Sequence, residues 1–134
     1  MDIKKYEFGD NLIYEIENLN NDVYQILTNM VNTETSLLRV SLEDFLMLCN
    51  GYKKLMIGMG KINELDKLLN LFNLYQDSDR MILTLKMKEA NPLLVLDTIK
   101  RIKQYFINID IIYSVDICDD EYDVVMYLPI IKEE

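Results

Sequence analysis

The stretch that decides the fold is Leu55-Met56-Ile57-Gly58-Met59. It is a short apolar run of strand length, which predicts a strand buried within the domain. A short amphipathic helix is predicted directly after it, on Leu65, Leu68, Leu69 and Phe72. A strand followed by a helix is a building unit of α/β domains.

The downstream residues continue this alternation. Residues 81–88 alternate apolar and polar side chains, which predicts a second strand. Asn91-Pro92 is a typical helix start, and the apolar spacing that follows predicts a helix ending near Phe106. The end of the chain predicts a hairpin, with strands over 109–117 and 122–130 around the acidic turn Asp119-Asp120-Glu121.

Upstream, apolar residues recur at alternating steps of four and three from Leu12 to Met30. This spacing predicts one long helix over residues 10–31. Ser41 is a suitable N-cap for a further helix that ends near Asn50-Gly51. The expected fold is therefore α/β, a long N-terminal helix followed by a small mixed four-stranded sheet covered by helices. We expect one domain over 1–134, with the helix at 10–31, a connecting segment at 32–41 and the sheet domain at 42–131.

The composition limits the classes of partner. The 134 residues include 14 basic and 23 acidic side chains and carry a formal charge of -9, which argues against nucleic acid binding. The charge fits either a basic partner or a merely solvated surface. No apolar stretch has the length of a membrane span, and the N-terminus lacks a signal-peptide core, so we expect a cytoplasmic protein without a membrane partner.

Catalytic motifs are missing from the sequence. There is no histidine, and Cys49 and Cys118 do not form a C-x-x-C pair, so the usual zinc, dithiol and nucleophile arrangements are absent. Gly58-Met59-Gly60 follows a strand, but Asn63 occupies the third glycine position of a phosphate loop. We therefore expect no enzyme, no cofactor and no metal.

Two groups of acidic residues have competing interpretations. The acids between residues 116 and 123 are interpreted as an exposed turn rather than a calcium site, because the EF-hand spacing is absent. Glu43 and Asp44 are interpreted as helix-capping acids rather than an acid/base pair.

Several stretches, in order, resemble FtsZ, the bacterial tubulin homologue. Residues 10–30 resemble its central helix, and residues 37–45 lie where FtsZ has its synergy loop. Residues 51–60 resemble the family's G-x-A-x-M-G-x-G strand. The tail, residues 111–116 and 123–128, resembles the last hairpin of the family's C-terminal domain. The resemblance implies the C-terminal half of FtsZ without the GTP-binding half.

The resemblance also implies a function. The family's synergy loop reads N-x-D-x-x-D, and the matching positions here are Arg39, Ser41 and Asp44, so only the last acid remains. The implied role is a non-catalytic protein that binds FtsZ or a tubulin-like polymer and caps or inhibits its assembly. The implied partner-binding residues are Leu37, Leu38, Arg39, Val40, Ser41, Glu43 and Asp44. A self-assembling module or small homo-oligomeric α/β protein is the alternative, and a small enzyme with an acidic site is a third.

Overall fold

The chain forms one six-stranded mixed sheet with helices packed on both faces. The structure is a computed structural model, and it describes residues 2–17, 19, 42–72, 78–106, 108–119 and 123–132. In chain order the described elements are β1 (Asp2–Phe8), β2 (Asn11–Glu17), α2 (Leu42–Cys49), β3 (Tyr52–Gly60), the 3-10 helix η1 (Ile62–Glu64), α3 (Leu65–Leu71), β4 (Arg80–Met87), α4 (Pro92–Tyr105), β5 (Asp110–Ile117) and β6 (Val124–Lys132). The strand order across the sheet is β1-β2-β3-β6-β4-β5.

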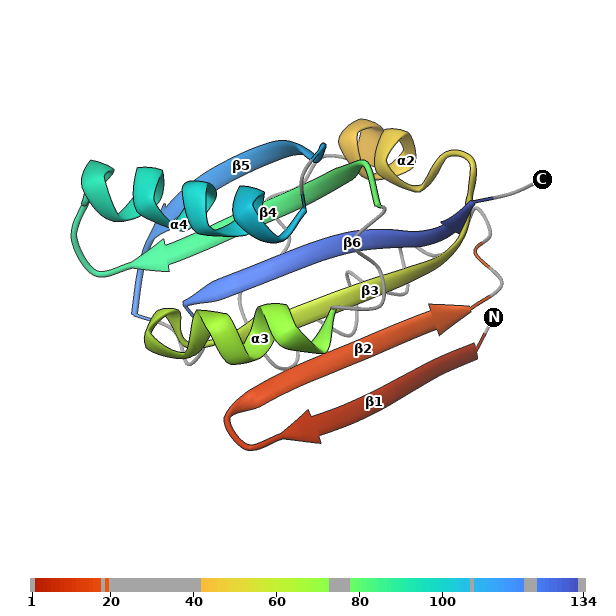
Figure 1. Cartoon of the computed structure of the whole chain (residues 1–134), viewed down its shortest axis with the longest axis horizontal. Coiled ribbons are helices and arrows are strands. Elements are labelled where there is room, and N and C mark those ends of the chain that lie inside the picture. The colour runs from red at the N-terminus through yellow and green to blue at the C-terminus, as the bar shows by residue number, and fades with distance from the viewer. Residues whose placement is uncertain are drawn as a thin grey trace.

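The central strands are buried on both faces. Helices α3 and α4 lie on the near face of the sheet in Figure 1. Helix α2 contributes Phe45 and Leu48 to a second apolar cluster on the opposite face. Strand β6 is buried throughout residues 124–130, as expected for a strand covered on two sides.

Strand β6 joins the two halves of the sheet. It pairs antiparallel with β3, from Tyr52↔Lys132 to Gly60↔Val124, and antiparallel with β4, from Ile82↔Tyr127 to Leu85↔Val124. Because β6 occupies one side of β4, the strand that follows α4 has only the other side available. Strand β5 therefore pairs parallel with β4, from Arg80↔Asp110 to Met87↔Ile117.

Helix α4 forms the crossover between these two parallel strands. The Asn91 side chain caps it by accepting a hydrogen bond from the Leu94 amide at 3.1 Å, and Pro92 occupies the first turn. The helix buries Val95, Thr98 and Ile102 against the sheet. A crossover helix of this kind is what a parallel strand pair requires.

An arginine connects helix α2 to the sheet. Arg80 donates a hydrogen bond from Nη1 to the Met47 carbonyl at 2.7 Å, within the last turn of α2, where a cation is favourable. Its guanidinium lies 5.1 Å from the centre of the Tyr52 ring. The Tyr52 hydroxyl donates to Asp79 at 2.5 Å, and this contact together with burial raises the pKa of Tyr52, with burial the larger cause.

The predicted helix over residues 10–31 is wrong. Residues 2–8 and 11–17 form the antiparallel hairpin β1–β2, and Gly9 takes a positive φ of 62° in its turn. The step from Leu12 to Ile16 fits a helix, but it is also two strand repeats, and both side chains lie on one face of β2. Apart from Leu19, the rest of the predicted helix lies outside the described residues.

The predicted four-stranded sheet and its terminal hairpin are wrong as well. The sheet has six strands, and β4 lies between β5 and β6, so the two segments predicted to pair are not neighbours. Alternation of apolar residues shows that a segment is a strand but does not select its partner. The broader expectation of a mixed α/β fold agrees with the structure, whereas the likeness to the FtsZ C-terminal domain expected for the whole chain does not hold.

We expect Gly58→Ala to destabilise the fold. A Cβ atom at Gly58 would lie 2.7 Å from Cζ and 2.8 Å from Cε2 of the buried Phe72 ring. Such overpacking costs about 1–3 kcal/mol, although alanine usually stabilises a strand relative to glycine. Urea unfolding should show this loss, and adding Phe72→Leu should recover part of it. Strict additivity of the two substitutions would contradict the proposed contact.

Candidate functional site: an apolar sheet edge

Strand β5 is an edge strand with exposed apolar side chains. Within the part of the chain that the structure describes, it pairs with β4 alone. Its exposed fractions are 50% at Ile112, 52% at Tyr113, 39% at Val115 and 53% at Ile117. A row of this kind on an unpaired edge invites another strand to pair with it.

The outward main-chain groups of β5 can be assigned from its contacts with β4. The Asp110 amide donates to the Asp79 carbonyl at 2.9 Å, and the Cys118 amide donates to the Met87 carbonyl at 2.9 Å. Successive residues of a strand direct their N–H and C=O groups to opposite sides. The even-numbered residues of β5 therefore face β4, and Ile111, Tyr113, Val115 and Ile117 present their amide and carbonyl groups at the open edge.

A groove runs between this edge and the start of α4. Its volume is about 380 Å³, and the lining residues are Ala90, Asn91, Pro92, Val95, Leu96, Tyr113 and Val115. Beside it, α4 exposes Leu93 by 78% and Leu96 by 64%, three residues apart on one side of the helix. The groove can therefore accept apolar side chains that belong to a strand added at β5.

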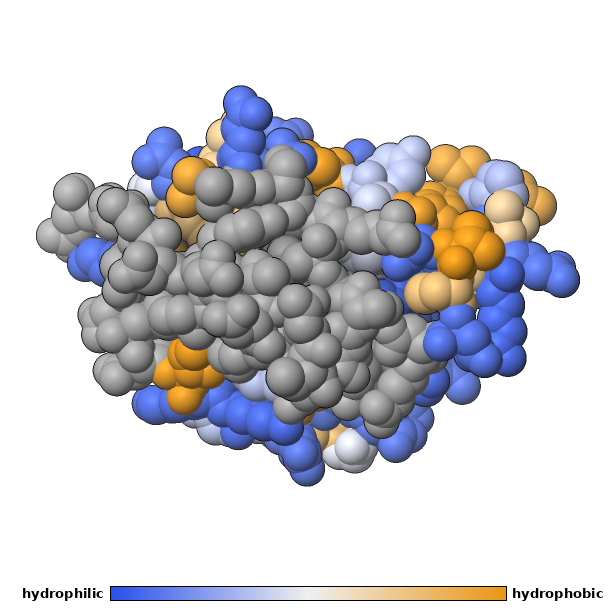
Figure 2. All heavy atoms as spheres, turned by 180° about the vertical axis from the view of Figure 1, so that it is seen from behind, coloured by the Kyte–Doolittle hydropathy of each residue, from blue (hydrophilic) through white to orange (hydrophobic). Residues whose placement is uncertain are grey.

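The opposite face of the sheet also carries exposed apolar surface. In Figure 2, hydrophobic residues gather on the side of the molecule where β4 and β5 end. On this face of the two strands, Thr84 and Ser114 are hydrogen bonded through their hydroxyls at 3.3 Å, and Ile112 is half exposed. Exposed apolar side chains thus flank the open edge on both faces.

The other edge of the sheet, β1, has a different character. It carries exposed Lys4, Lys5 and Glu7, and Lys4 lies 4.0 Å from Glu17 of β2. Its exposed aromatic residues Tyr6 and Phe8 stack on each other, with ring centres 6.3 Å apart. Charged side chains along an edge oppose strand addition, so β5 is the better docking edge.

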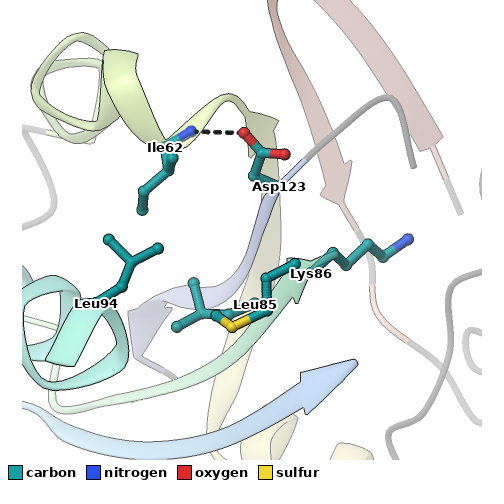
Figure 3. A pocket seen from close by; sticks show the side chains of 6 residues that line it. Ile62, Leu85, Lys86, Leu94 and Asp123 are labelled. Carbon is teal, nitrogen blue, oxygen red and sulfur yellow. Dashed lines mark hydrogen bonds between the residues drawn. The ribbon is translucent and has the colours of Figure 1, made fainter. Parts of the chain in front are cut away.

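A smaller pocket lies on the α4 side of the sheet, around Asp123 (Figure 3). Its volume is about 140 Å³, below the range of typical ligand pockets. The Asp123 carboxylate accepts a hydrogen bond from the Ile62 amide at 3.1 Å, and the Lys86 ammonium points away from it. Asp123 therefore orders the start of η1, and the geometry offers no acid/base pair here.

The structure separates the acids that were grouped in the sequence. Asp116 is buried on β5, Asp119 lies 3.7 Å from Lys88 on the surface, and Asp123 caps η1. Asp120 and Glu121 lie outside the described residues. Among the residues that are described, no three acidic or cysteine side chains are grouped so that they could hold a metal ion.

Most of the partner-binding residues implied by the FtsZ resemblance lie outside the described residues. These are Leu37, Leu38, Arg39, Val40 and Ser41. Glu43 is exposed and Asp44 half-buried, both in the first turn of α2. Their proposed role in binding stays a prediction.

The β5 edge was missed at the sequence level because the wrong neighbour was assigned to it. A helix between two strands is the pattern of a parallel crossover, and it indicates that residues 110–117 pair with residues 80–87. Ile112 was a second signal. It places an apolar side chain on the otherwise polar face of the strand, which is unusual for a solvent-facing position.

Comparisons with known proteins do not place the chain in a family. No protein-family model matches it, and no curated protein matches it. In the described part of the chain, no helix combines the length and apolar character needed to cross a membrane.

We expect the Cys49 thiol to react slowly in the folded protein. Burial raises the pKa of Cys49 from 9.0 to about 12, against a smaller opposite effect of Arg80. At pH 8 this lowers the thiolate fraction about a thousandfold, and the thiolate is the reactive species. In a Cys118→Ser variant, labelling by iodoacetamide should be correspondingly slow, should accelerate as the pH rises from 8 to 10, and should become fast in urea. Rapid labelling of the folded variant at pH 8 would contradict this assignment.

Proposed function

We propose that this chain is a non-catalytic interaction module that binds an extended protein strand along β5. The observation that carries the proposal is the open edge of β5, with which no other described strand than β4 pairs, and its outward N–H and C=O groups at Ile111, Tyr113, Val115 and Ile117. Strand addition to such an edge is a common mode of protein recognition, in which main-chain hydrogen bonds give affinity and alternate side chains give specificity.

The groove beside α4 supplies the specificity. Alternate side chains of an added strand point to the α4 face of the sheet, where Leu96, Tyr113 and Val115 line an apolar surface. The remaining side chains point to the opposite face, beside Ile112 and Ser114. The preferred partner strand is therefore apolar on the α4 face and tolerates polar residues on the other.

A synthetic strand tests this proposal. We expect a fluorescein-labelled peptide of residues 109–117 to bind the full chain, measured by fluorescence anisotropy. Val115→Pro should abolish binding, because proline removes an outward amide without removing a hydrogen bond to β4. Binding should also be lost for a peptide in which serine replaces Ile111, Tyr113, Val115 and Ile117.

The matched control is Glu7→Pro, which removes an outward amide from the β1 edge, because the closing pair Phe8↔Asn11 turns the amides of the even-numbered β1 residues toward β2. It should leave peptide binding unchanged while both variants retain the circular dichroism of the parent. If the peptide does not bind the parent at concentrations where the parent is monomeric, or binds Val115→Pro equally well, strand addition at β5 is wrong.

Docking on FtsZ or another tubulin-like protein is the second candidate function. It is supported by the sequence resemblance, two of whose stretches form the adjacent strands β3 and β6. On this proposal the chain co-sediments with FtsZ polymer and shortens filaments at substoichiometric ratio, and Arg39→Glu relieves the effect. Unchanged assembly at equimolar protein would exclude this role without bearing on the β5 edge.

A further inference from the structure

We infer that the strand bound at β5 is the β5 strand of a second copy of this chain, paired antiparallel about a twofold axis at Ser114. The inference rests on the proposed strand addition and names its partner. It makes the chain a symmetric homodimer with one sheet continuous across the interface.

The twofold symmetry limits the possible pairings. An axis perpendicular to the sheet keeps the α4 face of both copies on the same side, so residues of equal parity must lie opposite each other. The outward main-chain groups belong to the odd-numbered residues, so odd residues of one copy form hydrogen-bonded pairs with odd residues of the other. Each allowed register is then defined by the residue on the axis.

The side chains of β5 select one register. With Ser114 on the axis, Tyr113 lies opposite Val115 and Ile111 lies opposite Ile117, so every pair on the α4 face is apolar. With Tyr113 on the axis, Asp110 lies opposite Asp116, and like charges directly opposite destabilise a strand pair. With Val115 on the axis, Ile111 lies opposite Asp119. Only the Ser114 register combines full overlap of β5 with apolar pairs throughout this face.

The charge distribution permits self-association at this edge. The chain as a whole carries a charge of -9, which would oppose the approach of two copies. The segment from Arg80 to Cys118, which forms β4, α4 and β5, contains six basic and four acidic residues. The excess of acid therefore lies elsewhere in the chain, and the two edges meet without strong repulsion.

The same arrangement also buries exposed apolar surface of α4 beside the groove. Both α4 helices lie on one face of the joined sheet, on either side of the axis. Leu96, which is largely exposed in one copy, lines the groove that the second copy enters. The partner strand thus removes apolar surface of Leu96 and of the groove from water, which favours association.

The mass of the full chain in solution is the first test. Light scattering after size exclusion should give twice the 15.9 kDa of one chain at micromolar concentration. Val115→Lys should return the mass to one chain, because it places a cation in each apolar pair at the axis. Tyr6→Lys, the same type of change on β1, should leave the dimer intact.

Disulfide trapping tests the register. In a Cys49→Ser, Cys118→Ser background, Ser114→Cys places two thiols opposite each other on the axis. It should cross-link under mild oxidation faster than Tyr113→Cys or Val115→Cys, each of which lies on the axis of a rejected register. Faster cross-linking of either of those variants would overturn the Ser114 register.

The outcomes separate this inference from the function on which it rests. A chain that is monomeric at all concentrations but binds the β5 peptide has a strand-binding edge whose partner is a different protein, and the homodimer is wrong. A monomer that binds no peptide overturns both. A dimer that Tyr6→Lys dissociates and Val115→Lys does not would move the interface to β1 and also overturn the inference.

Discussion

The insertion of β6 between β3 and β4 is the constraint on which the rest of the structure depends. The last strand of the chain forms two antiparallel ladders at once, and its residues 124–130 are buried on both faces. These hydrogen bonds join the N-terminal β1–β2–β3 sheet to the β4–α4–β5 unit. Without β6, the two parts would share no ladder among the described strands. The two parts of the sheet are therefore joined only when β6 is in place, which gives the fold many contacts between residues far apart in the sequence.

The exposed edge is a direct result of that insertion. Once β6 has taken one side of β4, the parallel crossover through α4 can deliver β5 only to the other side. Its position there leaves the main chain of alternate residues without a neighbouring strand among the described elements. The same crossover sets α4 above the edge and forms the groove lined by Leu96, Tyr113 and Val115. The candidate site is thus built by the topology rather than by a local motif.

Local signals in the sequence predict the individual elements from residue 42 onward better than their arrangement. The apolar run at Leu55 predicts β3, and the Asn91-Pro92 cap predicts the start of α4, because both depend on neighbouring residues alone. The pairing of β5 and β6 depends on residues far apart, so alternation could not assign it. At Leu12 and Ile16 the spacing fits two periods, and only the Gly9 turn and the buried Ile13 on the second face distinguish the strand. The candidate site could be identified only from the strand order, and the spacing of residues in the sequence does not determine that order.

The unequal edges of the sheet determine how large an assembly can become. If a sheet can pair with further strands at both of its edges, identical units can add without limit, as in cross-β fibres. Here the β1 edge carries the charged residues Lys4, Lys5 and Glu7, which oppose strand pairing. Among the described strands, each unit therefore has one edge suited to pairing, β5. When two copies pair through β5, both β5 edges are occupied, and the dimer's outer edges are the two charged β1 strands. Assembly therefore stops at the dimer, because the charged residues of β1 prevent further copies from extending the sheet into a filament.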